Sequence, residues 1–440
     1  MTPAARVAAS IELLEAIEEA GRKPADAVAN AFFRDRRFIG SGDRRTVSDR
    51  VWGVLRARRK LGWWLEFAGG EASARLLVAA SLLLEGWDLA GVEQSFSGGK
   101  FGAAKLVDPE IAVLRRVEGR SMLHPAMPEF VRLELPEFVV PLLREKFGPK
   151  LDAEVAAMNA EAPLDLRVNT LKSNLADAIR LLGAEGIEAA PMKFSPFGLR
   201  VQGRRPVTSS KPFQDGAIEI QDEGSQLVAI LVGAKPGMRV VDWCAGAAGK
   251  TLALAALMEN KGQIVACDVS APRLEGAVKR LRRAGAFNVE RHLTEPGDKW
   301  AKRRAGSFDR VLVDAPCTGT GTWRRNPDGR LRLSETDVLE LVPKQAAILE
   351  DASRLVKPGG RLIYATCSLL PAENEHQIDA FLAHHPDFAL LPLDQVWPDA
   401  AVPCAGPYLS LTPRIHDTDG FFGAVMERRA IAKVPDEQPA

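Results

Sequence analysis

The chain has 440 residues and a formal net charge of +1, with 58 Lys and Arg against 57 Asp and Glu. This length allows two or three domains with cores of their own, and the near-neutral charge gives no overall nucleic-acid signal. Five unevenly spaced Cys form no disulfide framework, and no apolar run approaches the roughly 20 residues that span a bilayer. The acidic, amphipathic N-terminus does not resemble a signal peptide, so we expect a cytoplasmic protein without membrane contact.

Residues 1–125 are predicted to form a helical domain. Apolar residues recur there at spacings of three and four, as in Val7, Ile11, Leu14 and Ile17. None of the six His of the chain has a metal-ligand companion at useful spacing, so we expect no metal site.

Two features of the helical block bear on its function. Residues 34–60 carry ten Arg or Lys against three Asp, and this basic cluster is either a solvated helix face or a surface that tracks phosphates. Trp63, Trp64 and Phe67 are expected in a buried seam rather than on a base-stacking surface.

Residues 126–212 are predicted to form a small α+β domain. A helical stretch, Phe130–Met158, precedes two alternating segments that indicate strands, Leu164–Val168 and Gly198–Gln202, and a helical pattern over 175–182 lies between them.

From residue 213 to residue 430, short apolar strands alternate with amphipathic helices. This pattern predicts an α/β domain whose parallel sheet is covered by helices on both faces. Two last strands, Tyr408–Thr412 and Gly420–Met426, are expected to pair antiparallel at one edge, and residues 431–440 are expected to be disordered. Pro343 should kink or split a long helix. The expected strands are 239–243, 263–267, 308–313 and 361–365, and the expected helices are 250–258, 271–283, 335–355 and 372–384.

A turn rich in small residues follows the first of these strands, which ends at Asp242. Gly246 and Gly249 would let a ligand approach the backbone, and the free N–H groups of the next helix suit a phosphate or a carboxylate. A phosphate-binding P-loop needs Gly where Cys244 stands, and no dinucleotide fingerprint is present, which favours S-adenosylmethionine. Asp268 ends the second strand, where its carboxylate either accepts the ribose hydroxyls of a cofactor or caps the next helix.

Two Cys lie at the carboxyl ends of two further strands, Cys317 in the sequence Val-Asp-Ala-Pro-Cys and Cys367 in the sequence Tyr-Ala-Thr-Cys. Open α/β sheets gather their ligands at that edge, so we interpret both thiols as functional. We interpret Cys244, Cys267 and Cys404 as packing residues.

Two thiols beside an acid suit the methylation of carbon 5 of a pyrimidine. Carbon 5 of cytosine is a poor nucleophile until a thiolate adds to carbon 6, and the proton at carbon 5 must later leave. The reaction needs a nucleophilic Cys, an acid near ring nitrogen 3 and a base near carbon 5, which Asp314, Cys317 and Cys367 can supply. Lys250 is a candidate for lowering the pKa of the nucleophile.

The segment Gly319–Pro327 contains two Gly, Trp323 and the pair Arg324–Arg325. It either holds a single-stranded backbone with an extruded base or is an exposed structural loop.

These motifs resemble those of the Sun (Fmu-type, RsmB-like) family of bacterial RNA cytosine-C5 methyltransferases. The resemblance rests on Gln221–Ser225, Asp314–Cys317, Ala365–Ser368 and Asp419–Phe422. It implies a Rossmann-like methyltransferase fold with an antiparallel edge, S-adenosylmethionine as cofactor, and small-subunit ribosomal RNA as substrate.

The resemblance also implies roles for single residues. Cys367 would be the nucleophile and Cys317 would assist breakdown of the covalent adduct, whereas in DNA cytosine methyltransferases the Pro-Cys position attacks. The family's cofactor turn reads Cys-Ala-Ala-Pro-Gly-Gly-Lys, but this chain has Cys-Ala-Gly-Ala-Ala-Gly-Lys. The acid on the adenine falls on Glu295, with Asp298 as its rival. The cofactor-binding residues are then Cys244, Ala245, Gly246, Ala247, Ala248, Gly249, Lys250, Asp268, Glu295 and Asp314.

The helical block resembles the RNA-binding domain shared with the antitermination factor NusB, notably at Gly42–Arg45 and Val54–Arg56. This implies that the basic cluster at 34–60 meets RNA. We expect a monomer that methylates ribosomal RNA. The alternatives are a transfer RNA methyltransferase and, because the cofactor turn is altered, an RNA-binding assembly factor that has lost catalysis.

Overall fold

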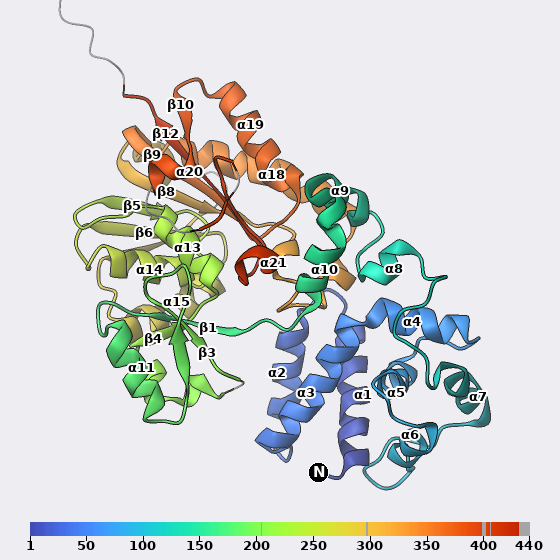
Figure 1. Ribbon diagram of the computed structural model, residues 1–440. Coiled ribbons are helices and arrows are strands. Elements are labelled where there is room, and N and C mark those ends of the chain that lie inside the picture. Colours follow the sequence, from blue (N-terminus) through green and yellow to red (C-terminus); the bar gives the residue numbers. More distant parts are fainter. Residues whose placement is uncertain (204, 296–297, 398–401, 405, 431–440) are drawn as a thin grey trace, which may run out of the picture. The chain divides into compact units, whose positions relative to one another are not determined.

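The helices at the start of the chain and the strands that follow them separate into two units (Figure 1). One comprises Met1–Ala160 and a short distant segment, Trp323–Ser334, and the other comprises Glu161–Thr322 and Glu335–Ala440. The computed structural model describes all residues except 204, 296–297, 398–401, 405 and 431–440, so the tail expected to be disordered lies outside the described residues.

The first unit is helical, as the apolar spacing predicts. Nearly all residues of α5 (Ala74–Leu84) are apolar and buried, so this helix lies within the core. Helix α1 starts after Thr2, whose hydroxyl accepts a hydrogen bond of 3.2 Å from the Ala5 N–H. The helices are α1 (Pro3–Glu19), α2 (Ala25–Asp35), α3 (Ser41–Arg56), α4 (Arg58–Phe67), α5, α6 (Leu89–Ser95), α7 (Asp108–Val117), α8 (Glu129–Leu133), α9 (Val139–Phe147) and α10 (Leu151–Asn159).

The segment Trp323–Ser334, with α17 (Gly329–Arg332), completes the first unit. The Asp328 carboxylate accepts a hydrogen bond of 3.0 Å from the Ala25 N–H at the start of α2. The fully buried guanidinium of Arg330 donates to the Glu134 carbonyl over 3.4 Å. These contacts tie a segment that begins six residues after Cys317 to helices near the start of the chain.

Burial of part of the segment Gly319–Pro327 bears on both interpretations of it. The side chains of Trp323 and Arg324 are only 1% and 3% exposed. An indole without an exposed face cannot stack on an extruded base, so that part of the interpretation is wrong, whereas Arg325 is half-buried and Asn326 is exposed.

The second unit contains a small antiparallel sheet and a large, mainly parallel one. The small sheet has the order β2 (Ala189–Pro191), β3 (Gly198–Val201), β1 (Leu164–Val168), β4 (Ile218–Ile220), and α11 (Leu175–Gly183) packs against it. Leu166, Val168 and Leu199 form its buried face, as the alternation in the sequence predicts.

The large sheet has the order β10-β12-β9-β8-β5-β6-β7, and β11 pairs with β12. The five strands β5 to β9 are parallel, whereas β10, β11 and β12 are antiparallel. This arrangement confirms the predicted α/β fold with an antiparallel edge. The strands are β5 (Arg239–Asp242), β6 (Gln263–Asp268), β7 (Val289–Leu293), β8 (Phe308–Asp314), β9 (Val356–Thr366), β10 (Phe388–Leu391), β11 (Leu409–Leu411) and β12 (Phe421–Arg428), and the longer helices are α13 (Glu223–Leu231), α14 (Gly249–Leu257), α15 (Ala271–Ala284), α18 (Glu335–Ser353) and α19 (Glu375–His384).

Strand β7 and the splitting of a helix at Pro343 are two of the local features in which the structure differs from the sequence-based expectations. Strand β7 was not predicted, because its residues Val-Glu-Arg-His-Leu at a sheet edge carry neither an apolar run nor alternation. Helix α18 runs through Pro343 without being split. Pro343 is the ninth residue of α18 and removes one backbone hydrogen bond. The packing of the later turns against β8 and β9 nevertheless keeps the helix continuous.

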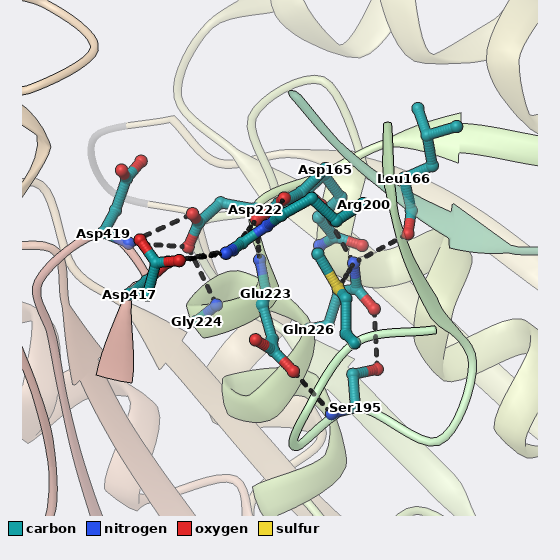
Figure 2. Close-up of polar contacts among 12 residues, drawn as sticks. Asp165, Leu166, Ser195, Arg200, Asp222, Glu223, Gly224, Gln226, Asp417 and Asp419 are labelled. Atoms are coloured by element: carbon teal, nitrogen blue, oxygen red, sulfur yellow. Dashed lines mark hydrogen bonds and ion pairs between the residues drawn. The ribbon is translucent and has the colours of Figure 1, made fainter. Parts of the chain in front are cut away.

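A polar network joins the small sheet to the start of α13, as Figure 2 shows. Arg200 of β3 donates to the buried Asp165 of β1 over 2.8 Å and also binds Asp417. Asp222 caps α13 by accepting from the Gly224 N–H at 2.8 Å. These bonds fix the beginning of α13, the helix that precedes the first strand of the large sheet.

Candidate active site

The two thiols at the strand tips meet at the carboxyl edge of the large sheet. Strands β8 and β9 are parallel neighbours with Asp314 opposite Ala365, so their tips end side by side. The Sγ atoms of Cys317 and Cys367 are 3.5 Å apart, within hydrogen-bonding reach for sulfur. Both side chains are half-buried. The site thus holds two adjacent thiols that solvent or a ligand can reach.

An ion pair lies at the same edge. The Lys250 Nζ, on the first turn of α14, is 2.6 Å from Asp314 Oδ2 at the tip of β8. Burial acts to lower the pKa of Lys250, but the Asp314 carboxylate outweighs it and the pKa is raised, with a further contribution from Cys367. Lys250 therefore carries its charge at neutral pH.

The pKa of Cys317 is raised, whereas a nucleophilic thiol needs a lowered pKa. Its hydrogen bond with Cys367, its burial and the charge of Glu373 together raise that pKa well above the ordinary thiol value. Cys317 is therefore protonated at neutral pH.

Glu373 is a part of the site that sequence reasoning missed. It ends a short 3₁₀ helix, Pro371–Glu373, and is fully buried. Its carboxylate accepts hydrogen bonds from the Thr318 N–H at 2.9 Å, the Thr318 hydroxyl at 2.5 Å and the Ser368 hydroxyl. The sequence signal for this residue was Glu-Asn-Glu after the second Cys motif. One acid is enough to cap the start of a helix, so a second acid there indicates a further role.

A second residue group holds the backbone behind the thiols. The Gly321 N–H donates to the Cys367 carbonyl at 2.9 Å, and the Gly420 N–H donates to the Gly321 carbonyl at 2.8 Å. The Asp419 N–H in turn donates to the Asp222 carboxylate, 3.0 Å to Oδ2 (Figure 2). The network at the start of α13 is therefore connected to the strand tip that carries Cys367.

The small-residue turn between β5 and α14 has two left-handed residues. Gly246 has φ of +54° and Ala248, which precedes α14, has φ of +61°. The Gly246 N–H donates to Asp268 Oδ2 and the Ser270 N–H donates to Asp268 Oδ1, both at 2.8 Å. The Asp268 carboxylate thus fixes the turn and the residue before α15, and each of its oxygens keeps further acceptor capacity.

Asp242, at the tip of β5, has an unsatisfied oxygen. The Thr251 hydroxyl donates to its Oδ2 over 2.7 Å, whereas its buried Oδ1 has no hydrogen-bond partner. Burial raises the pKa of Asp242 to about 7. An unpaired buried carboxylate oxygen next to the turn is suited to the ammonium group of a ligand.

A cavity of about 540 Å³ lies beyond the tips of β6 and β7. Both candidate adenine ligands, Glu295 and Asp298, line it. The Asp298 carboxylate is already bound to His292 Nε2 at 2.6 Å and to the Trp300 N–H at 2.8 Å. Glu295 is therefore better placed to receive a new donor. The other lining residues are Trp243, Val269, Ala271, Leu293, Thr294, Ala301, Lys302, Asp351 and Arg354.

The remaining Cys lie outside this pair. Cys267 is fully buried in β6, as expected of a packing residue, whereas Cys244 and Cys404 are half-buried. Burial raises the pKa of both Cys244 and Cys404, which disfavours a reactive thiolate. No cluster of three or more metal-ligating side chains occurs in the described part of the chain.

In the helical unit, much of the basic cluster is engaged with other protein groups. Arg36, Arg50 and Arg58 pair with Glu12, Glu85 and Glu18. The buried seam was predicted correctly for Trp64, which is 3% exposed, but wrongly for Phe67, which is 58% exposed. Phe67 lies at the last position of α4, where its ring stacks on Trp63 with centroids 4.6 Å apart.

Comparison with known proteins places this geometry in a family. Residues 229–427 match the family of 16S rRNA methyltransferases RsmB/F, and residues 135–208 match the ferredoxin-like domain of RsmF/B-like methyltransferases. A probable ribosomal RNA small subunit methyltransferase B of Synechocystis is 32% identical over 88% of this chain and 91% of the relative. The chain belongs to the RsmB/F methyltransferase family.

Further relatives agree with this assignment. The ribosomal RNA small subunit methyltransferase B of Klebsiella pneumoniae is 28% identical over 94% of this chain and 97% of its own length. The crystal structure of PH0851 superposes with a TM-score of 0.79 at 28% identity, covering 97% of this chain and 99% of that chain. A methyltransferase homologue from Pyrococcus horikoshii superposes with a TM-score of 0.60 at 31% identity, covering 70% of this chain and 100% of that one.

S-adenosylmethionine is the cofactor of this RsmB/F-family chain, and the residues at the turn fit it. The unpaired Asp242 Oδ1 suits its ammonium group, and the cavity beside Glu295 is apolar enough on the Val269 and Leu293 side for an adenine. Among the described residues, no helix is both long and apolar enough to cross a membrane.

Proposed function

We propose that this RsmB/F-family methyltransferase methylates carbon 5 of a cytosine in small-subunit ribosomal RNA through a covalent cysteine adduct. The observation that carries the proposal is the pair of thiols 3.5 Å apart, next to the Lys250–Asp314 ion pair. Few reactions other than addition to a ring need two thiols and an acid at one sheet edge.

Cys367 is the attacking group. The raised pKa of Cys317 disfavours attack by that thiol, whereas Cys367 interacts with the cationic Lys250. The Cys367 sulfur adds to carbon 6 of the cytosine, and the electron pair of the ring double bond moves to carbon 5. Asp314 lies near ring nitrogen 3 and orients Lys250, whose positive charge stabilises the negative charge that develops on the ring.

Release of the product needs the loss of the carbon 5 proton. S-adenosylmethionine supplies an electrophilic methyl group for carbon 5. Removal of the proton then restores the ring double bond and expels the Cys367 sulfur. Cys317, in hydrogen-bonding reach of that sulfur, assists this breakdown.

Asp242, Asp268 and Glu295 hold the cofactor, together with the backbone of Cys244, Ala245, Gly246, Ala247, Ala248, Gly249 and Lys250. The turn departs from the family pattern, but Gly246 adopts a left-handed conformation and α14 begins at Gly249, so free N–H groups remain available at the helix start. This supports an active enzyme over an assembly factor that has lost catalysis.

The helical unit is proposed to bind RNA as well. The relatives of the whole chain are named as ribosomal RNA small subunit methyltransferases, which favours a ribosomal substrate over transfer RNA.

The test separates the two thiols. Cys367→Ala should abolish methylation, and Cys317→Ala should trap a protein–RNA adduct that survives denaturing gels. Cys404→Ala, whose thiol donates to the Ser410 carbonyl at 3.7 Å, serves as the control and should leave activity unchanged. Full activity in Cys367→Ala would refute the role of the nucleophile.

The substrate is tested by bisulfite sequencing of RNA from cells that lack the protein. One cytosine in 16S RNA that resists bisulfite conversion in wild-type cells should be converted in the cells that lack the protein. A lost methyl group in transfer RNA would support the alternative substrate, and no change in any RNA would support the assembly factor.

A further inference from the structure

The cofactor turn, residues 244–250, is bound by a side chain from α15. Arg280 Nη1 donates a hydrogen bond of 2.8 Å to the carbonyl oxygen of Ala247. Inside the turn, the Ala248 N–H donates to the Ala245 carbonyl at 2.8 Å, and two further turn amides donate to the end of β6. The Arg280 bond therefore adds support from a distant side chain to a turn that is otherwise held by backbone amides.

The sequence of the turn explains why this support matters. Ala247 and Ala248 stand at the places where the family's turn has Pro and Gly. Pro restricts φ and Gly tolerates the left-handed region, so that pair predisposes a backbone to this kind of turn. Ala restricts the backbone less than Pro does, and Ala248 adopts φ of +61°, which is unfavourable for a residue with a Cβ. The turn of this chain thus depends more on bonds from outside it.

The guanidinium of Arg280 is oriented by a buried acid of the small sheet. Arg280 Nη2 donates to Glu219 Oε2 at 3.2 Å, so the two ends of one planar fork bind two different elements. Glu219 lies in β4 and is 2% exposed, whereas Arg280 is half-buried. Water and salt screen such a partly buried ion pair less than an exposed one. A rigid guanidinium that is held at one nitrogen also has the direction of its other nitrogens fixed.

A second Arg of α15 binds the same acid. Arg283 pairs with Glu219 Oε1, and its guanidinium lies over the Phe213 ring, with 4.0 Å between Cζ and the ring centroid. The end of the helix is fixed as well, because Asn169, directly after β1, donates to the Ala284 carbonyl at 2.8 Å. The small domain therefore holds both α15 and the side chain of this helix that contacts the turn.

We propose that Arg280 is a positioning residue, which Glu219 orients and which holds the cofactor turn in the conformation that binds S-adenosylmethionine. Arg280 acts through the Ala247 carbonyl. A turn that is already ordered loses less conformational freedom when a ligand binds, which increases the affinity. The inference deepens the proposed function and rests on the cofactor site proposed there for residues 244–250. It makes the small sheet one of the elements on which cofactor binding depends.

Calorimetric titration of the full-length protein with S-adenosylmethionine, without RNA, measures the effect on affinity. Arg280→Ala should raise the Kd by about tenfold, because the turn loses a hydrogen bond from a charged donor. Arg280→Lys keeps the positive charge but replaces the planar fork by one ammonium, so it should recover only part of the affinity. In methylation assays, Arg280→Ala should raise KM for S-adenosylmethionine and leave kcat at saturation near the wild-type value.

Arg283→Ala is the matched control. It removes the other Arg of α15 that binds Glu219 and leaves the bond to the Ala247 carbonyl in place, so the Kd should stay near the wild-type value. An equal rise of the Kd in Arg280→Ala and Arg283→Ala would overturn the role of the contact with the turn.

The orienting role of Glu219 is tested by a double variant. Glu219→Gln keeps the size of the side chain and removes its charge. Its effect on the Kd should combine with that of Arg280→Ala to less than the sum of the two changes in binding free energy, because both act through one side chain. Full additivity would overturn the orientation of Arg280 by Glu219.

Hydrogen–deuterium exchange of the cofactor-free protein gives a readout that needs no ligand. The amides of residues 244–250 should exchange faster in Arg280→Ala than in the wild type, because the turn opens more often. In Arg283→Ala they should exchange as in the wild type, and residues 361–366 of β9 should be unchanged in both variants. Unchanged exchange of the turn in Arg280→Ala, or faster exchange throughout the protein, would overturn the proposal.

The outcomes distinguish this inference from the proposed function. Since neither binding nor exchange involves RNA, failure of the cytosine chemistry would appear as a wild-type protein that binds S-adenosylmethionine but forms no 5-methylcytosine. Faster exchange of the turn in Arg280→Ala with an unchanged Kd would contradict both this inference and the cofactor site proposed at residues 244–250.

Discussion

A buried acid next to a cofactor turn links binding to stability at the level of one residue. The pKa of Asp242 is raised from 3.8 to about 7 by burial. The folded protein therefore binds a proton that the unfolded chain releases between these two values. The resulting stabilisation is fully present below about pH 4 and is lost as the pH rises to about 7.

Replacing this residue should separate the two effects. Asp242→Asn keeps the bond from Thr251, removes the titration, and should flatten the fall in the free energy of unfolding between about pH 4 and pH 7, an effect on the order of a few kcal/mol. Calorimetry across this range without cofactor measures the slope. The same variant should bind S-adenosylmethionine more weakly, since its ammonium loses a charged acceptor, and a variant with the wild-type slope and affinity would contradict this account.

The residues that the sequence predicted at the site share one property, which is their place at a strand tip. Cys317, Cys367 and Asp314 follow apolar runs that must be buried, so parallel pairing brings them to one edge regardless of detailed packing. Glu373 could not be found this way. Its partners come from three separate elements, and only the tertiary structure decides whether a Glu before a helix is a cap or a buried anchor.

At the level of elements, the close backbone contact between Gly321 and Gly420 controls the tip that carries Cys367. A Cβ at Gly321 would lie 2.2 Å from the Gly420 carbonyl oxygen, which is backbone and cannot turn aside. Two backbone hydrogen bonds would then be disturbed. The Gly321 N–H donates one to the Cys367 carbonyl, and the Gly420 N–H donates the other to the Gly321 carbonyl.

Gly321→Ala should therefore lose methylation by at least about tenfold and lower the melting temperature, because separating the two loops costs roughly 1–3 kcal/mol in a packed region. Gly359→Ala is the matched control, since Gly359 has φ of +74° but a Cβ there meets nothing within 4 Å. It should lose about 1 kcal/mol of stability from strain alone while keeping its activity per folded molecule. Equal losses of activity in both variants would show that the contact has no special role.

Element boundaries followed the sequence where periodicity was strong. The strands β5, β6 and β8 were predicted to within a residue or two, because each contains a short apolar run. The polar edge strand β7 was missed for the converse reason. The persistence of α18 through Pro343 shows packing against the sheet overriding a local breaker.

At the level of the whole molecule, the helical unit contains a candidate surface for RNA. A cavity of about 890 Å³ is lined by Trp63 and by four Arg, together with three acids. The exposed Phe67 ring stacks on Trp63, with centroids 4.6 Å apart, and its centroid is 5.0 Å from that of the His124 ring. An exposed aromatic ring suits an unpaired base. The charged and aromatic lining residues are Glu18, Arg22, Arg58, Arg59, Trp63, Glu66, Phe130, Asp328 and Arg332.

Phe67→Ala should weaken RNA binding by about fivefold or more, because stacking of one base on an aromatic ring is worth about 1–3 kcal/mol. It should raise KM for RNA with little change in kcat. Fluorescence anisotropy with a 16S RNA fragment measures the affinity. Phe101→Ala, which removes another ring that is 71% exposed, is the control, and equal affinity of both variants would argue against this surface.

The placement of residues 323–334 within the helical unit also bears on how the chain is made. These residues leave the ribosome only after strands β5 to β8 have been synthesised, although the α2 start and the Glu134 carbonyl that they bind have long emerged. The N-terminal helices consequently cannot reach their final form during the translation of their own 160 residues, and domain-by-domain maturation from the N-terminus does not apply to this chain.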